Sequence, residues 1–255
     1  MKDNERAEEL PSWLWLWFPP LIIVAQMLAR ARSEEFYVRW MRSEFGIVEQ
    51  GTVLFLVIAL ASAILLLVRK PLARPPGYAV WMFLMALGCL YFGGEEASWG
   101  QHYFGWKTPE VWAAVNEQQE TNLHNLGGIG DQAPRLVLTL GVLFGGVLLP
   151  LWFRGRGRDS ALLRHPLAWT IPTIVVLPSA LIATLVTLPK GIFRTFHQPV
   201  PYLVDFQAGE TKEYAFGLFL MLYMLSMWRR RERLQDMGSS HASAVAVDGS
   251  VRATN

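Results

Sequence analysis

The chain has 255 residues, of which 52% are hydrophobic, and a formal net charge of +2 at pH 7. This length suits one helical bundle with short loops and excludes two large domains. The net charge is too small to indicate a nucleic-acid partner, and the single cysteine, Cys89, excludes an intramolecular disulfide and a CxxC metal or redox motif.

The apolar residues are concentrated in blocks of roughly 20, the length that a helix needs to cross the hydrocarbon core. Unbroken apolar runs favour helices, because a membrane barrel would show alternation instead. The sequence therefore predicts an all-α, polytopic membrane helix bundle over residues 1–236. The six expected spans are 12–31, 47–68, 78–94, 134–153, 168–188 and 213–228.

The two ends of the chain carry different signals. Ala29-Arg30-Ala31 has the pattern of a signal-peptidase site, but the segment before it is net acidic, which favours a retained first span. From Met237 onward the sequence is rich in Ser, Ala and Gly without periodicity, so a disordered tail is expected over 237–255.

The distribution of Lys and Arg between the loops predicts that both termini lie in the cytoplasm. With this topology, acidic and histidine residues of three separate loops share the outer face. An excess of acidic residues opposite the basic loops explains the same sidedness without any function. In the fourth span, Gly141 and Gly145 form a small-xxx-small pair, which predicts a close helix contact.

The polar segment from Gly94 to Leu126, between the third and fourth spans, is the most promising place for function. Its first two carboxylates, Glu95 and Glu96, are costly at a bilayer boundary unless they are solvated, paired or metal-bound. Further along, Thr108 and Gly127 are typical of the two ends of a helix. The sequence therefore predicts an outer amphipathic helix over 109–126.

Three ionisable residues, Glu117, Glu120 and His124, share one stripe of this expected helix. Carboxylates with imidazoles are the ligands expected for zinc, manganese or iron, and a Glu–His pair also suits acid–base catalysis. HExxH and the di-iron ExxH spacing are both absent, and a solvated surface pair remains the alternative. The expected catalytic residues are Glu95, Glu96, Glu120 and His124, and the expected metal ligands are His102, Glu120 and His124.

Four further residues are candidates: Glu49, Glu117, His197 and Asp205. Glu49 opens the second span, where an ionisable group is either functional or snorkels to the surface. His197 and Asp205 belong to the loop over 190–210, which is expected on the outer side and is either a lid or a connection stiffened by proline.

The strings GGEEASWGQHYFG (93–105) and ETNLHNL (120–126) carry a resemblance to a known family. The chain resembles a family of uncharacterised bacterial multi-pass membrane proteins with GEE-x-SWGQ and TNLHNL-like strings. The resemblance implies a location in the bacterial inner membrane and carries no known activity.

Two hypotheses of function follow. The first is an enzyme that acts on a lipid or lipid-linked substrate at the outer membrane face, with an unidentified cofactor, a divalent transition metal such as zinc being one candidate. The second is a non-enzymatic assembly partner or transporter, whose polar outer segment binds a solute or a membrane protein. The enzyme hypothesis predicts that the histidines and glutamates of 94–126 meet in one coordination sphere, whereas the second predicts that they are spread out and solvated.

Overall fold

The computed structural model describes residues 10–69, 77–116, 119–123, 129–156 and 168–252. Within these ranges every regular element is helical, so the predicted all-α architecture is confirmed. The elements of the first half are η2 (Trp13–Trp17), α1 (Phe18–Arg32), α2 (Glu34–Tyr37), η3 (Val38–Arg42), α3 (Ile47–Val68), α4 (Tyr78–Glu96), η4 (Ser98–Gly100), α5 (Gln101–Phe104) and α6 (Glu110–Ala113). Those of the second half are α7 (Ile129–Gly141), η5 (Val142–Leu148), α8 (Leu149–Arg156), η7 (Ala168–Thr170), η8 (Ile174–Val176), α9 (Leu177–Leu185), α10 (Leu188–Thr195), η9 (Tyr202–Val204) and α11 (Ala208–Arg252).

Five helices in the described part of the chain are long and apolar enough to cross a membrane. They are Trp13–Arg32, Glu34–Val68, Tyr78–Glu96, Ala133–Gly155 and Ile174–Thr195, and each overlaps one of the first five predicted spans. The fifth is shifted toward the C-terminus, because the residues before Ile174 form a 3-10 turn and an extended stretch instead of α-helix. The sixth predicted span, 213–228, lies inside α11, which is not one of these five helices.

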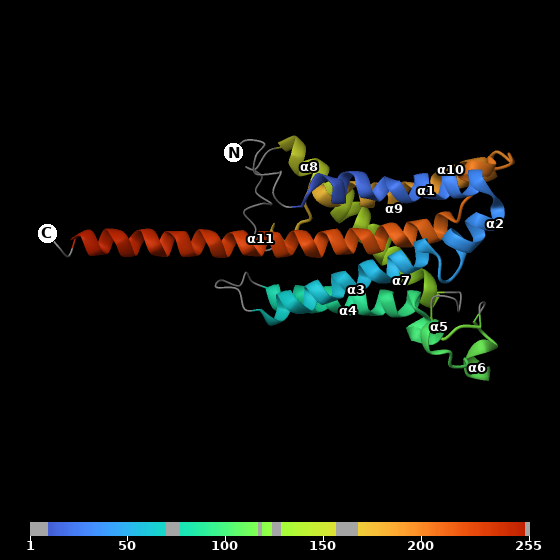
Figure 1. The fold of residues 1–255 in the computed structure, drawn as a ribbon, viewed down its shortest axis with the longest axis horizontal. Helices are drawn as coiled ribbons and strands as arrows, with labels where there is room; N and C mark the ends of the chain where they lie inside the picture. The colour runs from blue at the N-terminus through green and yellow to red at the C-terminus, as the bar shows by residue number, and fades with distance from the viewer. Residues whose placement is uncertain (1–9, 70–76, 117–118, 124–128, 157–167, 253–255) are drawn as a thin grey trace.

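Helix α11 occupies the middle of the bundle. Figure 1 shows it running between α1, α9 and α10 on one side and α3 and α4 on the other, and its closest neighbours are α3 and α9. Leu218, Leu222 and Met224 are completely buried. Close approach to α3 depends on Gly217, because a Cβ at this position would lie 3.2 Å from the carbonyl oxygen of Thr52. The small residue thus lets the two helix backbones pack tightly.

The fourth span contains another close contact, at Gly146. A Cβ there would lie 2.6 Å from the ring of Phe219 on α11 and 2.7 Å from Cβ of Ala180 on α9. The predicted close contact at Gly141 and Gly145 was wrong. A Cβ at Gly141 meets nothing within 4 Å, and one at Gly145 meets only Pro172, at 3.8 Å. The helix turns Gly146 toward its neighbours, whereas the glycines of the predicted motif face open space.

The segments expected on the outer face gather at one end of the bundle. Figure 1 shows α2, α5, α6 and α10 together at this end, and α11 extends beyond the opposite end. Helix α11 continues to Arg252. The disordered tail expected over 237–255 stays a prediction.

Candidate functional site

The site begins with a sharp turn at the end of α4. Ser98, Trp99 and Gly100 all have left-handed backbone conformations, with φ angles of 44°, 53° and 95°. This turn folds the Trp99 ring back against α4, where a Cβ at Gly94 would lie 2.8 Å from it. Two consecutive non-glycine residues in this region are strained, so surrounding contacts must hold the turn in place.

Glu120 supplies the main contacts that hold this turn. Its Oε2 accepts hydrogen bonds from the Ser98 hydroxyl at 2.7 Å and from Nδ2 of Asn122 at 2.6 Å. Its backbone N–H donates to Oδ1 of Asn116 at 3.0 Å. Asn116, Asn122 and Ser98 are all buried. We call the described residues of 105–123 the outer loop, after the side of the membrane on which they are expected. The outer loop is therefore fastened to the end of α4 by a network of buried polar groups.

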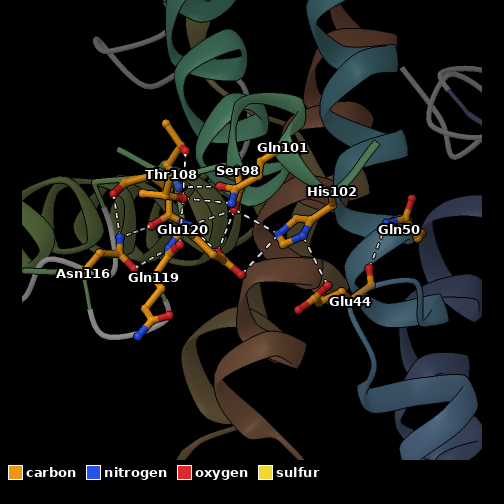
Figure 2. A network of polar contacts seen from close by, with 11 residues as sticks. Glu44, Gln50, Ser98, Gln101, His102, Thr108, Asn116, Gln119 and Glu120 are labelled. Carbon is orange, nitrogen blue, oxygen red and sulfur yellow. Dashed lines mark hydrogen bonds and ion pairs between the residues drawn. The ribbon is translucent and has the colours of Figure 1, made fainter. Parts of the chain in front are cut away.

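His102 lies between two carboxylates (Figure 2). Its Nδ1 is 3.2 Å from Oε2 of Glu44, and its Nε2 is 3.2 Å from Oε1 of Glu120. Nε2 also lies 3.1 Å from the Ser98 hydroxyl. We call this set the Glu44–His102–Glu120 cluster. It joins three segments that are far apart in the chain: the stretch before α3, the short helix α5, and the outer loop.

One ligand atom from each member of this cluster lies within 4.8 Å of the others, so the residue types and spacing suit a metal ion. The arrangement also satisfies a protonated imidazole, because each ring nitrogen faces its own carboxylate and both N–H groups can donate. A metal ion bound to one ring nitrogen of His102 would lie beside only one of the two carboxylates. The other carboxylate would lie on the opposite side of the imidazole ring. The predicted third ligand, His124, lies outside the described residues, so the predicted zinc site stays a prediction.

The described residues do not form the predicted outer amphipathic helix over 109–126. Among them only α6 is helical, and the chain then turns into a loop in which Gln119 has a φ of 59°. The expected cap, Thr108, instead donates its hydroxyl hydrogen to the carbonyl oxygen of Gln119 at 2.7 Å, which closes the loop. Asn and Gln side chains compete for backbone groups, and this segment is rich in them. Glu117 lies outside the described residues.

Glu95 is a structural member of this network. Its Oε1 accepts a hydrogen bond from the indole N–H of Trp99, and its Oε2 accepts one from the backbone N–H of Leu123, at 2.7 and 2.6 Å. The side chain is 2% exposed. Both carboxylate oxygens are therefore engaged in holding the turn and the loop together, which accounts for this buried charge without catalysis.

Glu96 has different surroundings, although it is also buried, at 8% exposure. One of its carboxylate oxygens lies within 4.8 Å of carboxylate oxygens of Glu210 and Glu213, which occupy the first turns of α11. Glu213 is paired with Arg135 on α7, with 3.4 Å between Oε1 and Nη2. We call Glu96, Glu210 and Glu213 the acidic cluster. Glu49, half-buried in the first turn of α3, is within electrostatic range of all three.

The acidic cluster stands at one end of a cavity of about 860 Å³ between α4, the α7–η5 helix and α11. Its charged lining residues are Glu95, Glu96, Arg135, Lys212 and Glu213, whereas its other end is lined by Trp81, Thr170 and Tyr223. Between the two ends the walls are almost entirely apolar. Fourteen residues of α11 separate Gly209 from Tyr223, so the cavity follows the bundle for about 21 Å at 1.5 Å per residue.

Glycine residues keep this cavity wide. Gly88, Gly141 and Gly209 line it, and a Cβ at any of them would meet nothing within 4 Å. Helical glycines usually permit close packing, and each costs about 1 kcal/mol of helix stability relative to alanine. Here they face open space, so their effect is to leave room for a ligand.

The remaining candidates, His197 and Asp205, lie with α10 and η9. His197 is exposed. Asp205 accepts a hydrogen bond from Nζ of Lys190 at 2.8 Å, and this bond together with the positive charge lowers the pKa of Asp205. Neither residue contributes to the acidic cluster or to the Glu44–His102–Glu120 cluster.

The structure thus divides the predicted site between two clusters. It brings His102 and Glu120 together with Glu44, and it places Glu96 apart from them, at the cavity. Sequence reasoning missed the partners of Glu96, which are Glu210 and Glu213. The available signal was the string GETKE at 209–213, a dense run of charges directly before an apolar span.

The fold and cavity define the protein as a polytopic, all-α membrane protein with an apolar cavity that is charged at one end. Comparisons with protein-family models, curated proteins and solved structures find no match for this chain. The resemblance carried by GGEEASWGQHYFG and ETNLHNL therefore stays a prediction.

Proposed function

We propose that the protein is a bacterial inner-membrane enzyme that acts on a lipid or lipid-linked substrate at the outer membrane face, with both termini cytoplasmic. The cavity is the observation that carries this proposal. It is apolar along most of its length and charged at one end, as the binding site of an amphiphile must be. The substrate's chain occupies the apolar part, and its polar head lies beside Glu96.

Exposed aromatic side chains support a position of the charged end of the cavity near the membrane surface. They gather at the outer end of the bundle: Trp99, Tyr103, Phe104 and Trp106 are all at least 41% exposed. The rings of Phe104 and Trp106 stack at 5.7 Å. Amphipathic aromatic rings are enriched at the level of the lipid headgroups. A headgroup bound near Glu96 is therefore close to the water needed for hydrolysis or group transfer.

The chemistry assigned to the chain is acid–base. Glu96 receives no hydrogen bond from the described residues, so its carboxylate is free to accept a proton from a substrate hydroxyl or from water. Arg135 and Lys212, which line the same end, stabilise negative charge that develops on the headgroup. Glu95 and Glu120 act as positioning residues, since they hold the turn that ends α4.

A second candidate function is that of a lipid-binding assembly partner without catalytic activity. It is favoured by the exposure of Phe104 on α5 and of Val111 on α6, at 79% and 84%. A partner that covers these side chains would remove them from water.

The experiment uses the full chain, purified in mild detergent, with bound lipids measured by native mass spectrometry. Gly88→Leu and Gly141→Leu fill open space in the cavity, so both variants are expected to fold and to lose the co-purified lipid. Gly191→Leu is the matched control, because a Cβ there also meets nothing within 4 Å but lies outside the cavity. Lipid retained by both cavity variants contradicts the proposal.

Catalysis is tested by incubating the protein with a labelled extract of bacterial membrane lipids. The wild type is expected to convert one lipid class, and Glu96→Gln is expected to leave that class unconverted. Binding by the wild type with no conversion of any class favours the assembly partner instead.

A further inference from the structure

The acidic cluster has the spacing of a single-ion site. Carboxylate oxygens from Glu96, Glu210 and Glu213 lie within 4.8 Å of one another. Oxygen ligands bind magnesium at about 2.1 Å and calcium at up to about 2.6 Å, so two ligands of one ion are at most about 4–5 Å apart. The three oxygens are therefore close enough to share one cation with small side-chain movements.

Glu96 supplies an independent indication of a ligand. It is 8% exposed, it lines the cavity, and it accepts no hydrogen bond from the described residues. A buried carboxylate in this situation costs several kcal/mol unless something neutralises it. Glu95 is the internal comparison, because the same type of side chain one residue earlier accepts hydrogen bonds at both oxygens.

The balance of charge gives the sign of that ligand. Glu49 and the three members of the acidic cluster interact electrostatically, and together they carry four negative charges when ionised. Glu95, which lines the same end, adds a fifth. Arg135 and Lys212 bring only two positive charges there, so the excess of negative charge favours a cation over an anion.

We propose that Glu96, Glu210 and Glu213 bind one divalent cation of the magnesium or manganese class, and that this cation holds the phosphate headgroup of the lipid in the cavity. An all-oxygen ligand set favours hard cations over zinc. Magnesium is commonly held by one or two carboxylates together with phosphate oxygens. Arg135 and Lys212 provide charge-assisted hydrogen bonds to the same phosphate. The headgroup assignment rests on the proposed function, whereas the cation site does not.

The test of the cation site is a Mn²⁺ titration of the full chain in detergent, followed by electron paramagnetic resonance. The wild type is expected to bind about one Mn²⁺ per chain in competition with Mg²⁺. Glu96→Gln and Glu213→Gln are each expected to weaken binding at least tenfold, because each removes a charged ligand. Thermal unfolding of each variant shows whether it is folded.

His102→Ala and Glu44→Gln are the controls, since both alter the Glu44–His102–Glu120 cluster and leave the acidic cluster intact. They are expected to bind Mn²⁺ as the wild type does. Loss of Mn²⁺ in the controls with retention in Glu96→Gln overturns the proposal. Absence of Mn²⁺ binding by the wild type also overturns it, and indicates that protons or an amine headgroup neutralise the acidic cluster.

The headgroup assignment is tested separately with Gly141→Leu. This variant is expected to lose lipid and keep Mn²⁺, so a failure of lipid binding does not affect the result for the cation. In the wild type, a lipid phosphate is expected to bind at least tenfold more tightly with Mn²⁺ than without it, and a diacylglycerol of the same chain length is expected to show no dependence on Mn²⁺. Equal Mn²⁺ dependence for both lipids, or none for the phosphate, contradicts the phosphate assignment.

Discussion

Glu95 and Glu96 are neighbours in the chain, yet their carboxylates have opposite surroundings. Glu95 accepts hydrogen bonds from Trp99 and from the backbone of Leu123, whereas Glu96 joins two carboxylates of α11 at the end of the cavity. Successive residues of a helix point about 100° apart, so one helix end serves two purposes. One carboxylate holds the outer loop, and the other faces the ligand site.

The first prediction compares glutamine at these two positions. Glu95→Gln is expected to lower the free energy of unfolding by about 1.5–3 kcal/mol, because it weakens charge-assisted hydrogen bonds to buried donors. Glu96→Gln is expected to leave stability unchanged or to raise it, because it removes buried negative charge. The measurement is thermal unfolding in detergent without added metal. Equal destabilisation by both substitutions would show that Glu96 also has a structural role.

The second prediction concerns the Glu44–His102–Glu120 cluster. Glu120→Ala is expected to cost about 2–3 kcal/mol, because Ser98 and Asn122, both buried, each lose a hydrogen bond to a carboxylate. Glu44→Ala is expected to cost less than about 1 kcal/mol, because the Glu44 side chain is 58% exposed. Thermal unfolding measures both values, and limited proteolysis of the outer loop reports whether it has been released. Comparable costs for the two substitutions would contradict this description of the cluster.

The third prediction concerns two glycines of the fourth span. Gly146→Ala is expected to destabilise the protein by about 1–3 kcal/mol, because the new methyl group meets Phe219 and Ala180 at less than 3 Å. Gly141→Ala is expected to be neutral or to stabilise by up to about 1 kcal/mol, because it gains helix propensity and meets nothing. Thermal unfolding of the two variants provides the comparison. The reverse order would place Gly141 at a packed helix contact.

The fourth prediction is a pH dependence at Asp205. Its pKa is lowered in the folded protein by the hydrogen bond and charge of Lys190, so its ionised form stabilises the fold. That contribution is present above the unfolded pKa of about 3.9 and is lost as the pH falls through the lowered folded value. Asp205→Asn is expected to cost less than about 1 kcal/mol at pH 7, since the pair is partly exposed. Thermal unfolding is expected to show a smaller difference at pH 3, and a difference that grows on acidification would refute the prediction.

The hydrophobic pattern predicted five of the helices that are long and apolar enough to cross a membrane, and it also predicted a sixth span that is not among them. The second span, 47–68, coincides with α3, because its apolar run begins directly after Gly46 and ends at the charged residues Arg69 and Lys70. The end of α4 was less predictable. Helix geometry carries on through Glu95 and Glu96, and the left-handed turn after it depends on contacts with the outer loop. Local sequence does not contain those contacts.

The candidate site was predicted only in part, because its contacts also join segments that are distant in the sequence. His102 and Glu120 were expected to share one site, with Glu120 on a capped helix, and the structure places them 3.2 Å apart without that helix. Their real partner, Glu44, lies more than 50 residues earlier in the chain. Glu210 and Glu213 reach Glu96 only because α11 packs in the centre of the bundle. Such pairings are decided by tertiary packing, which a single sequence does not reveal.

The central position of α11 constrains how the protein is made. α11 follows the five helices that are long and apolar enough to cross a membrane, and chains emerge from the ribosome from the N-terminus onward. While the earlier helices enter the membrane, the inner faces of α3 and α9 have lipid or one another as neighbours. One wall of the cavity and two of the three residues of the acidic cluster are made last, with α11. A nascent chain that ends before α11 therefore lacks both this wall and most of the acidic cluster.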